Sequence, residues 1–155
     1  MKKYFLAFVL FASITANAQS KVNANFGKLY QNYISIKSSL VADDAKKTSM
    51  EATQFLKTIT AIKSTSISDK SKKSLELSAK SISAAKNIAE QRKSFYKLSD
   101  LMIEVANENS VSDKTIFVQF CPMAKGSWLS NEKQIANPYY GKSMLTCGSV
   151  KSEIK

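Results

Sequence analysis

The feature that most constrains the fold is a long stretch without helix breakers. Residues 25–109 contain no proline and a single glycine, Gly27, at their start. Proline interrupts helices and glycine destabilises them, so this stretch can form long helices. Its apolar residues recur every three or four positions, the period of a helix with one buried face. The sequence therefore predicts a helical body over residues 25–110.

Caps and breaks in the apolar pattern divide this body into four helices. The expected helices span residues 26–41, 45–62, 69–85 and about 20 residues from Ile88. Asp43 and Asp44 stand where they can cap the second helix, and Ser68 or Asp69 can cap the third. The short joints favour an up-down-up-down bundle, and the fold class is all-α or mainly α.

The first eighteen residues have the pattern of a signal peptide. Two lysines precede an apolar run over residues 4–14, and the small residues Ala16 and Ala18 suit a signal peptidase. We expect cleavage between Ala18 and Gln19, which leaves a flexible N-terminus over residues 19–24. The mature chain has no apolar run long enough to span a bilayer. It is therefore expected in the periplasm or secreted.

The last part of the chain has a different composition. Residues 111–155 hold both prolines, both cysteines and the single tryptophan. They predict a small irregular Cys/Met cap packed on the bundle, so that the chain forms one domain overall. A strand over residues 115–120 and a return strand at residues 128–130 would form a short β-hairpin. A helical turn is expected to run from Ser130 or Asn131 through Ile135.

Several motifs in this segment resemble a known family. They are Cys-Pro-Met-Ala at 121–124, Trp-Leu-Ser at 128–130, Asn-Pro-Tyr-Tyr-Gly at 137–141 and Met-Leu-Thr-Cys-Gly at 144–148. Together with Leu-Val-Ala-Asp-Asp at 40–44, they resemble the DUF3347 family over about residues 26–151. The resemblance implies an exported helical domain of Bacteroidetes-type bacteria. It also implies a link to heavy-metal efflux, since the domain occurs attached to periplasmic adaptor subunits of such systems; an efflux adaptor or other envelope protein is the expected partner.

The four sulfur-containing residues of these motifs suggest a metal site. If residues 121–123 stay extended, Cys121 and Met123 share one side of a strand, and Met144 and Cys147 share a face of a helical turn. Two thiolates and two thioethers are soft donors suited to copper(I). We therefore predict a copper(I) site formed by Cys121, Met123, Met144 and Cys147 in a soft-metal binding or handling protein.

A disulfide is the main alternative. Two cysteines in an exported chain commonly pair, and a Cys121–Cys147 bridge would stabilise the fold by roughly 3.5 kcal/mol in the chain-entropy model. The chain would then be a non-catalytic structural or interaction module that docks an envelope partner, or a thiol redox protein. In each case Trp128, Tyr139 and Tyr140 are expected to pack in the cap, where they could shield the sulfurs.

Other functions are disfavoured by composition. The chain has no histidine, which excludes Ser-His-Asp triads and H-E-x-x-H zinc sites. We expect no enzymatic activity and no cofactor besides copper(I). Nucleic-acid binding is also not expected, because the chain has one arginine and no recognition motif. Lysines crowd residues 63–86 and could attract an acidic partner or an anionic membrane surface, although a solvated helix face explains them more simply.

Overall fold

The described residues form four helices followed by a small sheet. A computed structural model describes residues 22–63 and 66–155; the predicted signal peptide and its cleavage site lie outside them. The helices are α1 (Ala24–Val41), α2 (Ala45–Ala61), α3 (Asp69–Ala84) and α4 (Ile88–Glu108). The strands are β1 (Ile116–Cys121), β2 (Gly126–Ser130) and β3 (Ser149–Ile154), with a short 3-10 helix, η1 (Gly141–Met144), before β3. The prediction of a mainly α protein is confirmed.

Each helix begins at a polar cap. The side chains of Asn23, Asp44, Ser68 and Asn87 accept a backbone N–H from the first turn of their helices. This satisfies N–H groups that have no partner within the helix. The N–H of Asn23 also donates to the carbonyl of Ser110 (3.0 Å), which ties the start of α1 to the end of α4.

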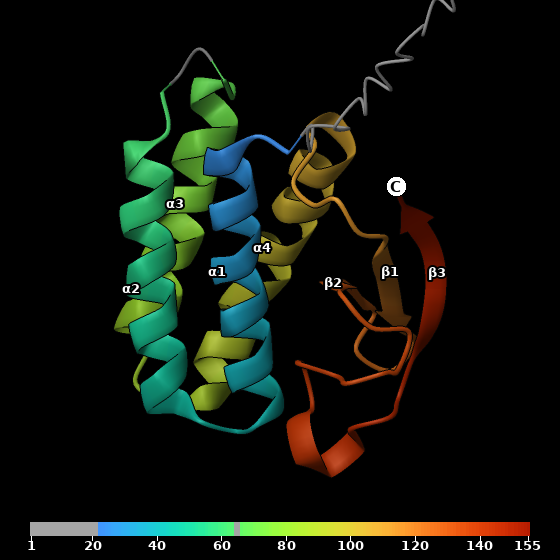
Figure 1. Ribbon diagram of the computed structural model, residues 1–155. Helices are drawn as coiled ribbons and strands as arrows, with labels where there is room; N and C mark the ends of the chain where they lie inside the picture. Colours follow the sequence, from blue (N-terminus) through green and yellow to red (C-terminus); the bar gives the residue numbers. More distant parts are fainter. Residues whose placement is uncertain (1–21, 64–65) are drawn as a thin grey trace, which may run out of the picture.

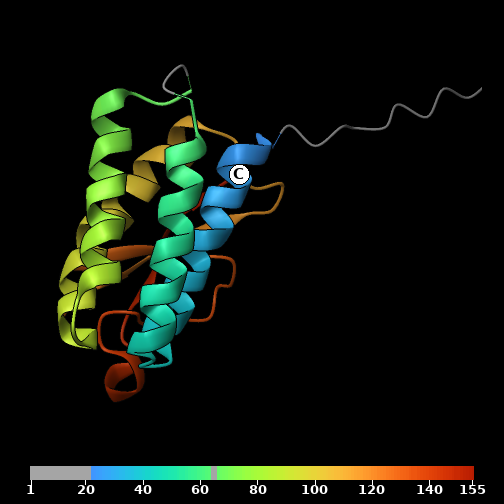
Figure 2. The ribbon, with the colours of Figure 1, turned by 90° about the vertical axis from the view of Figure 1, so that its left-hand side faces the viewer.

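The helices and the sheet share one core. In Figure 1, α1 and α4 lie between the sheet and the pair α2 and α3; Figure 2 shows α2 and α3 side by side, with α2 beside α1. Tyr33 of α1 stacks on Phe95 of α4, with ring centroids 5.4 Å apart. The Tyr33 hydroxyl also accepts the N–H of Leu129 in β2 (3.0 Å). The sheet is therefore fixed to the helices by packing and by a buried hydrogen bond.

The sheet is antiparallel, with strand order β2-β1-β3. The predicted hairpin is present as β1 and β2, in a register that pairs Gln119 with Trp128 and Cys121 with Gly126. The sequence did not indicate β3. That strand is exposed along most of its length, so it lacks the alternation of apolar and polar residues that marks a half-buried strand.

Two local predictions in this region are wrong. Residues 131–134 form bends, and residue 135 is irregular, instead of the expected helical turn. The Gln119 side chain donates there to the carbonyls of Glu132 (2.8 Å) and Lys133 (3.2 Å), which fixes an irregular path. Residues 122–125 form the hairpin turn, with Lys125 at φ 52°, so Cys121 and Met123 do not lie on one extended strand.

No helix in the described ranges is both long and apolar enough to cross a membrane.

Candidate functional site

The structure brings the two cysteines together. Cys121 is the last residue of β1 and is fully buried, whereas Cys147 lies between η1 and β3 and is half-buried. Both are free thiols, and their Sγ atoms are 2.7 Å apart. A disulfide bond is about 2.04 Å long, so a further approach of about 0.7 Å would close it. The residues predicted to form a bridge or share a metal are therefore neighbours.

The two methionines flank this pair through their backbones. Backbone hydrogen bonds link Met123 to the thiols of both cysteines. The N–H of Cys147 donates to the carbonyl of Met144 (3.1 Å), as expected for a turn. The side chain of Met123 is 65% exposed and that of Met144 is 36% exposed. Met123 therefore adjoins both thiols and Met144 lies one turn before Cys147, while both methionines are exposed to solvent.

The two thiols differ in acidity. Burial alone raises the pKa of Cys121, but hydrogen bonds from Cys147, Ala124, Met123 and Asn137 outweigh it and hold the pKa of Cys121 below its usual range. The pKa of Cys147 is raised, first by its hydrogen bond to Cys121 and then by burial and the Cys121 charge. Of the two thiols, Cys121 is therefore the one that loses its proton first as pH rises.

The hydrogen bonds of Asn137 hold this arrangement in place. Asn137 is fully buried, and its amide donates to the carbonyl of Cys147 (2.8 Å) and to the Cys121 thiol. Its side-chain oxygen accepts the N–H groups of Tyr139 (2.8 Å) and Tyr140 (3.2 Å). In the sequence, Asn137 stood out only as the first residue of the motif at 137–141, with no role assigned to its side chain. The available signal was the Asn-Pro-Tyr-Tyr-Gly motif, since an asparagine that bonds the backbone two residues on forms an Asx turn.

A second set of contacts fixes the same segment to the helices. Arg92 of α4 donates to Asp43 (2.5 Å) and to the carbonyls of Leu40 and Pro138 (both 2.9 Å). The other carboxylate oxygen of Asp43 accepts the N–H of Lys142 (3.1 Å). The hydrogen bond from Arg92 holds the pKa of Asp43 below its usual range. We call Arg92 and Asp43 the clamp.

The clamp corrects the role predicted for Asp43. Asp44 alone caps α2, through the N–H of Lys47 (2.8 Å), whereas Asp43 adopts φ 61° and faces Arg92. Gly141 lies against the clamp at φ 55°, and a Cβ there would fall 2.2 Å from both an Arg92 nitrogen and an Asp43 oxygen. Asp43 is 49 positions from Arg92 and 99 positions from Lys142 in the sequence. Local spacing could therefore not predict these contacts.

The predicted aromatic residues lie around the pair in different ways. Trp128 and Tyr139 are buried, with ring centroids 5.9 Å apart in an edge-on contact. The Tyr139 hydroxyl donates to the carbonyl of Ser127 (2.6 Å), and the ring stacks on Tyr96 at 4.0 Å. Tyr140 is half-buried, and its hydroxyl donates to the carbonyl of Met123 (3.3 Å). These three side chains therefore support the segments that carry the sulfurs.

Lys37 and Ser130 form a pair that resembles a catalytic one. The Lys37 ammonium donates to the Ser130 hydroxyl (3.5 Å), and burial lowers the pKa of Lys37. The Ser130 oxygen also accepts the N–H of Glu132 (3.2 Å), and Ser130 is 1% exposed. A hydroxyl that is buried and used as an acceptor is not presented to a substrate.

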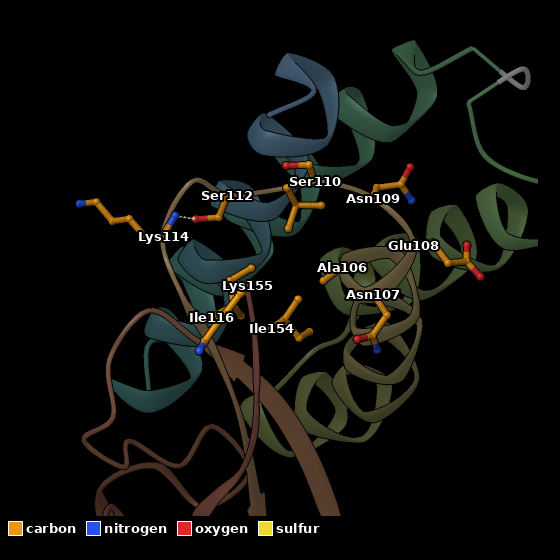
Figure 3. A pocket seen from close by; sticks show the side chains of 11 residues that line it. Ala106, Asn107, Glu108, Asn109, Ser110, Ser112, Lys114, Ile116, Ile154 and Lys155 are labelled. Carbon is orange, nitrogen blue, oxygen red and sulfur yellow. Dashed lines mark hydrogen bonds between the residues drawn. The ribbon is translucent and has the colours of Figure 1, made fainter. Parts of the chain in front are cut away.

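The chain also has a hollow of about 220 Å³ where the end of α4 meets the sheet. Ile116 and Ile154 reach from the strands toward Ala106 and Asn107 of α4 (Figure 3). Lys114 and other small or polar residues complete the rim. None of the predicted site residues lines this hollow, and no metal-binding group of three or more His, Cys, Asp or Glu side chains occurs in residues 22–63 and 66–155.

Comparison with protein families matches the helical part of the chain. The family described as "Protein of unknown function (DUF3347)" matches residues 29–114, from α1 to the loop before β1. The chain belongs to the DUF3347 family. The resemblance predicted over residues 26–151 is thus confirmed for the helices, whereas the motifs at 121–148 lie beyond the match. No curated protein and no solved structure gives a significant match to this DUF3347 member.

Proposed function

We propose that this DUF3347 member binds a soft metal ion, copper(I), for handling or for delivery to a heavy-metal efflux system. The observation that supports the proposal is the meeting of the Cys121 and Cys147 thiols (2.7 Å), with Met123 beside both thiols and Met144 one turn before Cys147. In this proposal the helices form an up-down-up-down support, and residues 111–155 are the Cys/Met cap that carries the ligands.

The acidity of the thiols suits this role. Thiolates, not thiols, bind metal, and the lowered pKa of Cys121 makes its thiolate the more accessible first ligand of the two cysteines. Cys147 would release its proton as copper(I) binds, so affinity rises with pH. Methionine side chains are flexible and polarizable, so exposed thioethers can turn toward an ion held by the thiolates. Trp128, Tyr139 and Tyr140 would keep water from one side of such a site.

A competition experiment with a chromophoric copper(I) chelator tests the proposal. The reduced chain from Gln19 onward should take one copper(I), and Cys121→Ser with Cys147→Ser should abolish binding. Met123→Leu with Met144→Leu should weaken it by at least about tenfold. Met50→Leu is the matched control, because Met50 is 64% exposed on α2 and does not flank the cysteines. Equal affinity of the wild type and the paired methionine variant would remove the methionines from the site.

A structural module with a Cys121–Cys147 disulfide is the second candidate. The 2.7 Å separation of the sulfurs favours it, because little movement is needed to form the bond. Intact mass of protein taken from the periplasm distinguishes the candidates. The bridged protein would be lighter than the reduced chain by two hydrogens and would carry no metal. If its mass also stays the same after exposure to copper(I) without reductant, the result would support the bridge and overturn the metal site.

The remaining parts of the proposal concern location and activity. We infer export to the periplasm or medium with cleavage between Ala18 and Gln19, and a non-catalytic role beside an efflux adaptor or another envelope protein. N-terminal sequencing of the exported protein tests the cleavage site. A mature chain that begins at Met1 would overturn export by this route.

A further inference from the structure

Most of the positive charge lies on α2, α3 and their short connections. Residues 45–86 contain nine lysines and three acidic residues, a net charge of +6. The chain from Gln19 onward has 21 basic and 12 acidic residues, a net charge of +9. The two helices lie side by side on the side of the molecule away from the sheet (Figures 1 and 2). This basic face therefore points away from the cysteine pair.

On α2, an exposed apolar side chain sits among the outward lysines. Met50 is 64% exposed, and Lys46 and Lys57 are exposed at helix angles within about 40° of it. This stripe is opposite the buried residues Ala52 and Phe55. The outward face of α2 thus has an apolar centre flanked by positive charge.

Helix α3 repeats the arrangement. Leu77 is 56% exposed, and Lys70, Lys73 and Lys80 are exposed within about 60° of it around the helix. The stripe is opposite the buried Leu75 and its neighbours on α3. A single exposed apolar residue is ordinary on a protein surface. The same placement on two adjacent helices indicates one continuous surface, which we call the lysine face.

We propose that the lysine face binds the anionic headgroup surface of a phospholipid membrane. Lysines flanking an apolar residue suit such an interface, because the ammonium groups meet phosphates while the apolar side chain enters the acyl boundary. Helices of 17 and 16 residues extend about 24 Å, so the face is a long ridge. Its cations are all lysines, which bind as point charges, whereas a defined carboxylate partner favours the bidentate arginine. Binding in this orientation leaves the sheet and the cysteines directed away from the membrane.

Vesicle co-sedimentation tests the proposal on the chain from Gln19 onward. The protein should bind vesicles of phosphatidylcholine with about 30% phosphatidylglycerol at low salt, and binding should fall at least tenfold at about 0.5 M salt. It should not bind pure phosphatidylcholine. Lys70→Gln, Lys73→Gln and Lys80→Gln together should weaken binding at least tenfold. Leu77→Ser should weaken it by a smaller factor at unchanged charge.

A matched variant separates the lysine face from net charge. Lys97→Gln, Lys114→Gln and Lys125→Gln remove three exposed charges outside the lysine face and should leave vesicle binding within twofold of wild type. Circular dichroism checks that each variant is folded. Equal loss in both triple variants, or binding to immobilised polyglutamate with none to anionic vesicles, would overturn the membrane assignment. Copper(I) affinity should be unchanged in all of them, so failure here leaves the metal proposal standing.

Discussion

The helical body and the C-terminal segment are held together in different ways. In the helices, many buried apolar side chains share the core. Most of them can be replaced by another apolar side chain of similar volume at a small cost in stability. The C-terminal segment depends on individual polar atoms, above all those of Arg92, Asp43 and Asn137. The helical body therefore tolerates change because its contacts are redundant, whereas the C-terminal segment has few substitutes for each contact.

The largest expected effect is closure of the Cys121–Cys147 bond. Oxidation should raise the free energy of unfolding by about 3.5 kcal/mol, because the bridge restricts the unfolded chain between the two cysteines. Urea unfolding with and without reductant measures the difference. Cys147→Ser should show no response to reductant and is the milder control, since Cys121 is fully buried. Identical curves for the wild type in both conditions would show that no bridge forms.

The next largest effect is expected at Gly141. Alanine there would be strained at φ 55° and its Cβ would displace the clamp, so we expect a loss of about 3 kcal/mol. Gly27→Ala is the contrasting change in the helical body. The added Cβ would lie 3.0 Å from a side-chain carbon of Val22. Gly27 lies in α1, where alanine is favoured over glycine. The free energy of unfolding should therefore stay constant or rise by up to about 1 kcal/mol. Denaturant unfolding measures the free energy of unfolding of both variants. Equal losses in the two would contradict the proposed difference between the helical body and the C-terminal segment.

Removing Arg92 should have a smaller, pH-dependent effect. Arg92→Met loses three hydrogen bonds and should destabilise the protein by about 2 kcal/mol at neutral pH. The pKa of Asp43 is lower in the folded protein than in the unfolded chain. The contribution of ionised Asp43 to the free energy of unfolding is therefore fully present above the unfolded pKa of about 3.9. It is lost as pH falls through the pKa of the folded state. The difference in the free energy of unfolding between wild type and Arg92→Met should therefore be constant from pH 7 to about 5 and decrease below about pH 4. A difference that increases in acid would contradict the pairing of Arg92 with Asp43.

The smallest effects are expected at the neighbouring tyrosines. Tyr139→Phe removes a buried 2.6 Å hydrogen bond and should cost about 1 kcal/mol. Tyr140→Phe removes a 3.3 Å bond from a half-buried hydroxyl and should cost no more than about 0.3 kcal/mol. Thermal unfolding of the two variants measures the difference. A larger loss for Tyr140 would mean that its bond to Met123 does more to hold the hairpin turn than its geometry indicates.

The sequence predicted the helices well because their signals are local. The apolar spacing, the cap at Asp44 and the choice of Ser68 or Asp69 for α3 all lie within a few residues of the structure they produce. The hairpin was also predictable, since Trp128 and Leu129 return along β1 after a short turn. The errors at residues 131–135 and the missed strand β3 occur where the conformation depends on a partner outside the segment.

For the candidate site, the sequence supplied the residues of the proposed metal centre. Two cysteines and two nearby methionines in a chain without histidine predict a site of soft sulfur donors. The folded structure was needed to show that the two thiols are neighbours, that Asn137 bonds the carbonyl of Cys147 and that Arg92 anchors the segment to α4. Distance along the chain explains this difference. Helical periodicity is encoded every three or four residues, whereas these contacts join residues 10 to 99 positions apart and form only when the whole core has packed.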